Sequence, residues 1–199
     1  MEITAALVKE LRDRSGVGMM ECKKALVETG GNIDNAFDYL RKAGAAKALK
    51  KEGRDAKEGV IISYIHPGAK LGVLLELNCE TDFVAKTEDF VSLGNDIAMH
   101  IAATDPLAVS IEDISSEVVE KEKEIYSDQA NKTNKPAEII EKMVEGRLKK
   151  FYKENVLIEQ DFVKDPNKTI KDIITDTVGK LGENIVVSRF GRFQLGEKN

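Results

Sequence analysis

Apolar residues recur at helical spacing in three successive stretches within the first 44 residues of the chain. An interval of three or four residues places side chains on one face of an α-helix, so each stretch predicts a short amphipathic helix. Glycines separate the stretches at 16–18 and 30–31, Asn32 is a favourable N-cap for the third helix, and Gly44 is predicted to end it. The three apolar stripes are Ile3, Leu7 and Leu11; Met19, Cys22 and Leu26; and Ile33, Phe37 and Leu40.

A pattern typical of strands follows the helical stretches. Residues 60–65 are apolar and largely β-branched, residues 66–70 supply turn chemistry, and residues 73–79 form a second apolar run, which favours an antiparallel hairpin. Residues 185–190 and Phe193 alternate again near the end of the chain. A strand there would complete a three-stranded antiparallel sheet with helices on one face, which is an α+β fold.

Four helices are predicted between the hairpin and the last strand. The first follows the corner at Asp82, carries an apolar stripe at 90–101 and ends at Asp105-Pro106, and the others lie at residues 118–129, 136–151 and 169–181. Pro136 stands in the favourable first turn of the third of these helices, and Gly182 is predicted to end the fourth. A turn at residues 131–135 joins the second and third. Those two helices could form a hairpin that projects from the body, although their apolar pattern is too short for a true coiled coil.

Composition divides the chain into three parts. Residues 45–58 are rich in Lys, Ala and Gly and lack an apolar face, so they are predicted to be a connector that is partly helical. Residues 1–44 then form a separate three-helix module, and residues 59–199 form the α+β core. Three short helices bury little surface by themselves, and compact modules of this kind often serve as attachment devices.

Charge is distributed unevenly along the chain. Residues 1–57 carry 12 basic and 9 acidic side chains, a net +3, while the remainder carries 18 against 26, a net −8. The basic residues are concentrated at Arg41, Lys42, Lys47, Lys50, Lys51, Arg54 and Lys57. This stretch is either a solvated linker or a phosphate-binding stripe. Aromatic residues for base stacking are missing from it and the acidic remainder repels a polyanion, so an RNA- or ribosome-binding role is only the second interpretation.

The sequence favours a cytoplasmic protein. Its apolar stretches all fall short of the ~20 residues that cross a bilayer, and the first ten residues have neither a basic leader nor an apolar signal core. The two cysteines, Cys22 and Cys79, are too few for a disulfide framework and lack metal-ligand spacing. We expect two reduced, packed thiols.

Little in the sequence indicates enzymatic or cofactor chemistry. His66 and His100 are the only histidines, and they fall in a predicted turn and a predicted helix without any paired metal ligand. The chain lacks both phosphate-binding glycine motifs, because the glycines at 16–18 are followed by methionines instead of a lysine and a hydroxyl. We therefore expect no metal, no cofactor, no nucleotide bound directly and no catalytic residues.

The most informative segment is the corner at residues 78–83, where an apolar strand ends in Asn-Cys-Glu-Thr-Asp-Phe. Thr81 and Asp82 are helix-starting residues, so Phe83 falls where the chain leaves the sheet. In one interpretation Asp82 caps the next helix and Phe83 packs into the core, and the residues alone favour it. In the other, the acid and the ring are presented for function.

Methionines next to a glycine loop are a second candidate surface. Met19 and Met20 follow the glycines at 16–18, and Arg12 lies one helical turn earlier. Methionine adapts its shape readily and arginine is a common interface anchor. The register of Met19 with Cys22 predicts that Met19 is core, which leaves Met20 as the better candidate for exposure.

Four segments resemble the bacterial translation elongation factor Ts family, in its short form. They are VKELRDRSGVGMMECKKAL at 8–26, NCETDFVA at 78–85, FYKENVLIEQDFVKDPNKTIKDII at 151–174 and GENIVVSRFGRF at 182–193. The first three predicted helices likewise resemble a ubiquitin-associated module whose contact edge is the loop at 16–20. The resemblance covers nearly the whole chain.

This resemblance implies a function without catalysis of covalent chemistry. Family members promote the release of GDP from elongation factor Tu, and the helical module docks on its G domain. The resemblance carries the docking role to Arg12, Met19 and Met20, with Lys23 and Lys51 as additions. It carries the exchange role to the corner residues Thr81, Asp82, Phe83 and Val84: Phe83 would wedge between helices of the G domain while Asp82 disturbs the network around Mg²⁺ and the phosphates.

The resemblance also implies a homodimer. Longer family members contain two related core halves, whereas this chain holds one, and short members compensate by dimerising. The residues give the same expectation, because a single core half with an apolar last strand at 185–190 leaves a sheet face or edge open.

Overall fold

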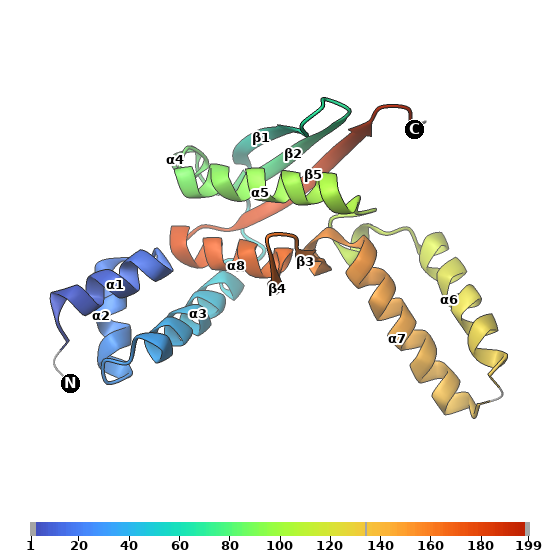
Figure 1. Cartoon of the computed structure of the whole chain (residues 1–199), viewed down its shortest axis with the longest axis horizontal. Helices are drawn as coiled ribbons and strands as arrows, with labels where there is room; N and C mark the ends of the chain where they lie inside the picture. Colours follow the sequence, from blue (N-terminus) through green and yellow to red (C-terminus); the bar gives the residue numbers. More distant parts are fainter. Residues whose placement is uncertain (1–2, 134, 198–199) are drawn as a thin grey trace. The chain divides into compact units, whose positions relative to one another are not determined.

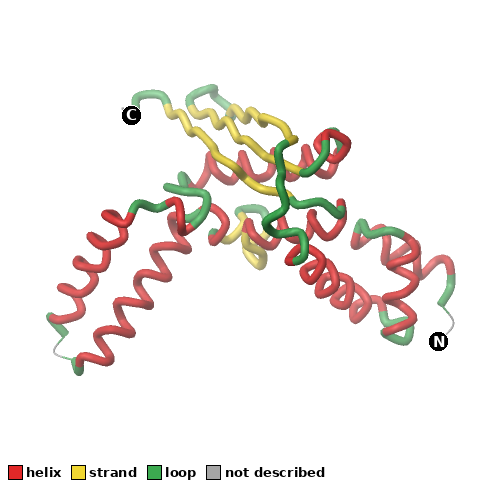
Figure 2. Tube along the Cα trace, turned by 180° about the vertical axis from the view of Figure 1, so that it is seen from behind, coloured by secondary structure: helices red, strands yellow, loops and turns green. Residues whose placement is uncertain are grey.

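The computed structural model describes residues 3–133 and 135–197 and has the predicted α+β fold (Figure 1). Its elements are α1 (Ala5–Ser15), α2 (Met19–Glu28), α3 (Ile33–Leu49), β1 (Glu58–Ile65), β2 (Leu71–Cys79), α4 (Asp82–Ala85), α5 (Glu88–Thr104), η1 (Ile111–Asp113), α6 (Ser116–Asn131), α7 (Ala137–Asn155), η2 (Leu157–Glu159), β3 (Asp161–Phe162), β4 (Asp165–Thr169), α8 (Ile170–Leu181) and β5 (Ile185–Gln194). The predicted three-stranded sheet has the order β1-β2-β5 (Figure 2).

The described residues form two compact units. The first contains the chain up to residue 60 together with residues 77–93 and 172–186. The second contains residues 61–76, 94–171 and 187–197. Every candidate site residue named from the sequence belongs to the first unit.

The first three helices share a core of their own within the first unit. Its buried residues are Val8, Leu11, Cys22, Ala25, Leu26, Ala36 and Leu40. Thr4 caps α1 by accepting the Leu7 N–H at 3.3 Å, and Gly16 ends this helix with a φ of 66°. The predicted cap at Asn32 is confirmed, because its side-chain oxygen accepts the Asn35 N–H at 2.9 Å.

The prediction that Gly44 ends the third helix is wrong, because α3 continues to Leu49. Gly44 instead lies against Gly179 of α8, and a Cβ added to Gly179 would come within 3.0 Å of the Gly44 Cα. Because glycine has no side chain, the backbones of the two helices can approach closely at these positions. Gly44 therefore allows α3 to pack closely against α8. The first residues of the predicted connector, 45–49, are part of α3.

In the second unit, α5 covers one face of the sheet (Figures 1 and 2). Ile97 and Ile101 of this helix are fully buried, and so is Leu75 of β2. Leu74 alternates with the buried residues Val73 and Leu75 and is 49% exposed. One face of the strand is thus covered and the other contributes to an apolar surface.

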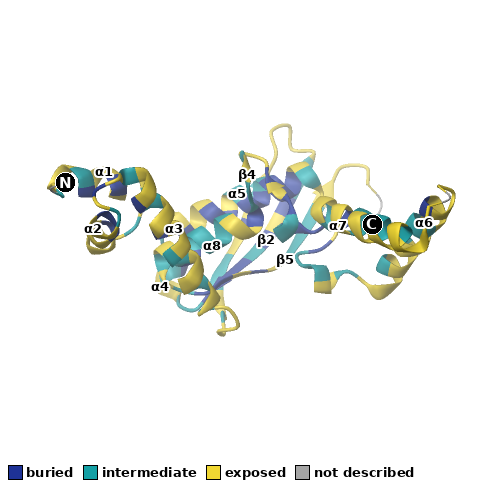
Figure 3. Cartoon of the chain, turned by 90° about the horizontal axis from the view of Figure 1, so that it is seen from below, coloured by how far each residue is buried: buried dark blue, intermediate teal, exposed yellow. Residues whose placement is uncertain are grey.

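The predicted helical hairpin is present in the second unit, where α6 and α7 lie side by side (Figures 1 and 2). Both helices expose most of their residues (Figure 3). The Arg147 guanidinium lies 5.9 Å from the centre of the Tyr126 ring and ties one helix to the other. Pro136 is the N-cap of α7 and not its first helical residue. The turn predicted at 131–135 includes Asn134, which lies outside the described residues.

A short hairpin of β3 and β4 was not predicted. Residues next to this hairpin contact His100, which is fully buried. The Nε2 atom of His100 lies 2.9 Å from Gln160 Oε1, and its Nδ1 atom lies 3.3 Å from the backbone nitrogen of Val163. The N–H of Val163 can only donate, so Nδ1 accepts and Nε2 carries the proton. Burial lowers the pKa of His100, which keeps the ring neutral.

Candidate partner-binding site

The corner after β2 presents a phenylalanine to solvent. Thr81 caps the single-turn helix α4 through its hydroxyl, which accepts the Val84 N–H at 3.5 Å, and Ala85 is the residue that α4 buries. Phe83 is 79% exposed. The interpretation in which Asp82 caps the helix and Phe83 packs into the core is therefore wrong, because the cap lies one residue earlier and α4 turns Ala85 inward.

Asp82 is the first residue of α4 and is also exposed. Its carboxylate accepts a hydrogen bond from Lys86 Nζ at 2.6 Å, and this bond raises the pKa of Lys86. The two side chains are 50% and 74% exposed, so water competes for both. Asp82 can therefore exchange Lys86 for another partner with little loss of stability.

The methionines at the start of α2 form the second exposed group. Met20 is 78% exposed, as predicted, but Met19 is 46% exposed and the prediction that it is core is wrong. The core positions of α2 begin one turn later, at Cys22 and Ala25, and Gly18 caps the helix without adding a side chain beside Met19. Both methionines are thus available for contact.

The remaining docking candidates separate into two places. Arg12 and Lys23 are exposed on α1 and α2. Lys51 follows α3 and is half-buried. It lies near the corner, because its positive charge contributes to lowering the pKa of Glu80. Lys51 is therefore associated with the corner and not with the methionines.

Helix α8 contacts the loop that leads into α2; we call residues 16–20, which include Met19 and Met20, the methionine loop. A Cβ on Gly16 would come within 2.7 Å of Lys180 Cε, so the Lys180 side chain occupies the space that this glycine leaves. Lys180 Nζ also donates to Asp89 Oδ1 at 2.6 Å. Together with the Gly44–Gly179 contact, this packing holds the three-helix core and α8 in one compact unit.

Carboxylates from two segments hold the backbone of the corner, a feature that sequence reasoning missed. Glu183 accepts both the N–H and the hydroxyl of Thr81, at 2.9 and 2.7 Å. Glu80 accepts the N–H of Asn184 at 2.8 Å, and this bond is the main reason that the pKa of Glu80 is lowered. Glu183 and Asn184 belong to the motif at 182–193, but nothing in their residue types indicates a contact more than 100 positions away.

The described residues contain no group of three or more His, Cys, Asp or Glu side chains arranged to hold a metal ion. Cys22 and Cys79 are buried free thiols, as predicted, and burial raises the pKa of Cys79. Within the same described part, no helix has the length and apolar character needed to cross a membrane.

Comparison with known proteins identifies the family. The family model for elongation factor Ts matches residues 47–197. Elongation factor Ts of Fervidobacterium nodosum is 59% identical, over 99% of this chain and 100% of that protein. Those of Thermodesulfovibrio yellowstonii and Syntrophobacter fumaroxidans are 59% and 54% identical, again over at least 98% of both chains.

The chain belongs to the elongation factor Ts family. It is thus a factor of translation elongation, a part of protein biosynthesis, and the resemblance stated from its four sequence segments is confirmed. The comparisons match the core and the helical module alike, since the similarity to the relatives extends over residues outside 47–197. They assign no role to individual side chains, so the roles of the corner and of the methionine loop stay predictions.

Proposed function

We propose that this member of the elongation factor Ts family is a guanine-nucleotide exchange factor that binds elongation factor Tu with GDP and promotes GDP release. The observation that carries the proposal is the exposure of Phe83, 79%, on a corner whose backbone is held by hydrogen bonds. A fixed and exposed aromatic ring is suited to enter a partner, because little conformational freedom is lost on binding.

In this proposal the methionine loop binds the partner and the corner promotes nucleotide release. Met19, Met20, Arg12 and Lys23 bind the G domain of elongation factor Tu, while Lys51 lies beside the corner. Phe83 inserts between helices of the G domain, and Asp82 leaves Lys86 to disturb the network that holds Mg²⁺ and the phosphates in the partner. The Thr81 cap and Val84 keep α4 formed during this contact.

Exchange of this kind needs no covalent step by the chain itself. A protein that binds the nucleotide-free G domain better than the GDP-bound form lowers the affinity for GDP by the same factor. We accordingly propose that the chain is not an enzyme with catalytic residues of its own, that it binds no nucleotide directly, and that it works in the cytoplasm with the translation machinery.

The second interpretation, an RNA- or ribosome-binding role for the basic connector, loses support from the ion pairs of that segment. Lys47 pairs with Glu21, Arg54 with Glu80, and Lys57 with Asp55. Three of the seven basic side chains thus have acidic neighbours within the chain. Phosphate-dominated binding would weaken steeply with salt, whereas contact through Phe83 and the methionines should persist.

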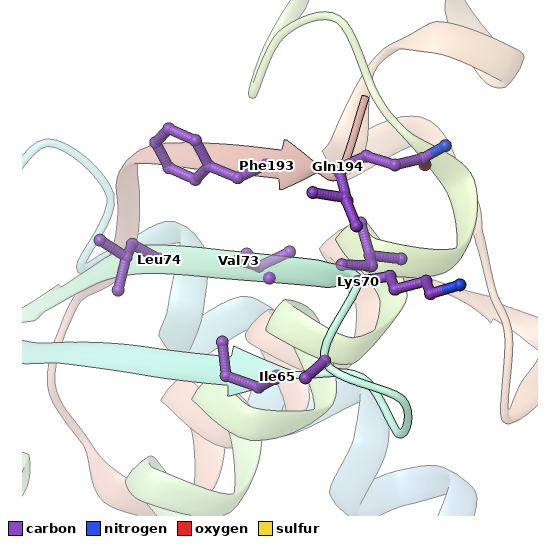
Figure 4. Close-up of a pocket in the computed structure, with 10 residues that line it drawn as sticks. Ile65, Lys70, Val73, Leu74, Phe193 and Gln194 are labelled. Carbon is purple, nitrogen blue, oxygen red and sulfur yellow. The ribbon is translucent and has the colours of Figure 1, made fainter. Parts of the chain in front are cut away.

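We further propose a homodimer that covers the outer face of the sheet in the second unit. Ile61, Ile65, Leu74 and Phe193 expose between 49% and 64% of their surface there. Ile65, Leu74 and Phe193 belong to three different strands and line an apolar groove of about 490 Å³ (Figure 4). A second copy of the chain fits this face because it would bring the same apolar surface.

The dimer proposal has its own test. Sedimentation at micromolar concentration should give twice the mass of one chain, and Leu74→Lys should give the single mass, because a charge on the groove opposes apolar contact. A chain that sediments as a monomer from micromolar concentration upward would remove the proposal.

The exchange proposal is tested by the release of fluorescent GDP from elongation factor Tu, with and without the chain. Acceleration by the chain should saturate with its concentration and should change little between low and moderate salt. Release at the uncatalysed rate would contradict the proposed function.

A further inference from the structure

The backbone that carries Asp82 and Phe83 is held by a reciprocal pair of carboxylate contacts. Glu183 Oε2 accepts the Thr81 N–H at 2.9 Å, while Glu80 Oε1 accepts the Asn184 N–H at 2.8 Å. Each segment therefore offers one carboxylate to a backbone N–H of the other. We call this arrangement of Glu80, Thr81, Glu183 and Asn184 the corner clamp.

Side chains extend the clamp on both sides. Thr81 Oγ1 donates to Glu183 Oε1 at 2.7 Å, which leaves its lone pairs for the Val84 N–H. Asn184 is buried, and its side-chain amide donates to the Arg54 carbonyl oxygen at 2.9 Å. The cap of α4 thus depends on Glu183 for its orientation, and the clamp reaches back to the segment after α3.

The corner needs such support because α4 is only four residues long. One helical turn costs more conformational entropy than its hydrogen bonds return, so it does not persist by itself. Phe83 contributes little to holding it, since its ring is mainly in solvent. The end of β2, the buried Ala85 and the clamp hold the backbone from which the ring projects.

The loop that carries Glu183 is itself determined by the end of α8. Gly182 has a φ of 78°, which glycine adopts without strain, and its N–H donates to the Val178 carbonyl oxygen at 2.8 Å. The chain then enters β5 at Ile185. Glu183 therefore extends from a short segment held at both of its ends.

We propose that Glu183 is a positioning residue for exchange, which orients Phe83 through the Thr81 cap without touching the partner. This inference rests on the proposed function. Charge-assisted hydrogen bonds are stronger than neutral ones, so both oxygens of Glu183 contribute to order at the corner. Loss of Glu183 leaves the methionine loop intact and allows α4 to sample other directions.

Kinetics with elongation factor Tu separate positioning from binding. Glu183→Ala should lower the maximal rate of fluorescent-GDP release about tenfold and leave the half-saturating concentration within about twofold, because the docking residues are unchanged. Glu183→Gln keeps an acceptor for the Thr81 N–H but cannot accept the Thr81 hydroxyl proton, so it should give an intermediate rate. Glu154→Ala, which removes an exposed carboxylate that pairs with Lys150 on α7, is the matched control and should exchange at the full rate.

A double-mutant cycle tests whether Glu183 acts through the ring. If it does, adding Glu183→Ala to Phe83→Ala should slow exchange by less than about twofold beyond Phe83→Ala alone. Independent, multiplicative effects of the two substitutions would overturn the inference. If the Ala variant melts early, Glu183→Gln replaces it in the same cycle.

A spectroscopic measurement on the isolated chain removes the dependence on the partner. The sequence contains no tryptophan, so Phe83→Trp places a single indole at the corner. Its fluorescence anisotropy should fall when Glu183→Ala is added and stay constant with Glu154→Ala. Unchanged anisotropy, or full exchange by a folded Glu183→Ala chain, would overturn the clamp, whereas an inactive wild-type chain would instead reject the proposed function.

Discussion

Gly44 of α3 and Gly179 of α8 are in backbone contact, with the position of a Gly179 Cβ lying 3.0 Å from the Gly44 Cα. The contact is not symmetric, since a Cβ on Gly44 would lie 3.7 Å from the Gly179 Cα, an ordinary van der Waals distance. The two glycines therefore make different predictions for substitution. This contact joins the three-helix core to the helix that leads into the clamp.

Gly179→Val should destabilise the chain, because a branched side chain cannot fit between the two backbones. Overpacking of this kind costs about 1–3 kcal/mol, which corresponds to a melting temperature lower by about 3–10 °C. Gly44→Ala is the matched control and should melt at the wild-type temperature or above it, since alanine favours the helix. Circular dichroism measures both. Equal melting temperatures for the two variants would show that the helices do not meet at these glycines.

Deletion of residues 1–44 should weaken docking more than exchange. The three helices have a separate core, and the proposed docking residues Met19 and Met20 lie on it. The truncated chain should need a higher concentration to accelerate GDP release and should approach the same maximal rate. An unchanged half-saturating concentration would refute the attachment role. We also predict that the three-helix module folds by itself. Because α3 ends at Leu49 and not at Gly44, this is best tested with residues 1–49.

Asp82→Ala should slow exchange without a change in the melting temperature. The carboxylate does not cap α4, and it pairs with the exposed Lys86. Lys86→Ala removes the same ion pair but keeps Asp82, so it serves as the control and should retain exchange. If both variants lose exchange equally, the ion pair and not the carboxylate is what the partner requires.

His100 should make the stability of the second unit depend on pH. The ring is buried and neutral with a lowered pKa, whereas in the unfolded chain it titrates near the ordinary value of about 6.5. Below that pH the unfolded state binds the proton and the folded state does not, so stability is highest above it and falls as the pH is lowered.

His100→Gln should therefore flatten the decline in melting temperature between about pH 7.5 and 5.5. His66→Gln is the matched control, because His66 is exposed on the turn after β1. A His100→Gln chain with the wild-type slope would mean that the ring is not held neutral.

Periodicity predicted the elements well because most of them are amphipathic. The stripe of Phe90, Leu93, Ile97 and Ile101 identifies α5, and all four residues are buried. The failures have local causes. Gly44 was interpreted from its residue type as a helix end, and only the presence of Gly179 on another helix explains why α3 continues. The hairpin of β3 and β4 is too short for a pattern and depends on contacts with His100.

The candidate site was predictable as a segment but not as a geometry. The sequence placed Phe83 at a strand-to-helix corner, yet the residues alone favoured a buried ring, because exposure depends on which side of a one-turn helix meets the core. The same limit applies to Met19, whose register with Cys22 indicated burial although it stands at the open start of α2. Glu183 could not be found, since its contact joins segments far apart in the chain.

Phe83→Ala tests the proposed role of Phe83 in exchange most directly. The measurements are fluorescent-GDP release from elongation factor Tu and a circular-dichroism melt of the same preparation. Because the ring is 79% exposed, the variant should melt with the wild-type chain, whereas Phe90→Ala, which removes a fully buried ring, should lose about 3–5 kcal/mol of stability. If the ring acts as the wedge, the stable Phe83→Ala variant exchanges GDP slowly. Full exchange activity in that folded variant would contradict it and would move the site to Arg12, Met20 and their neighbours.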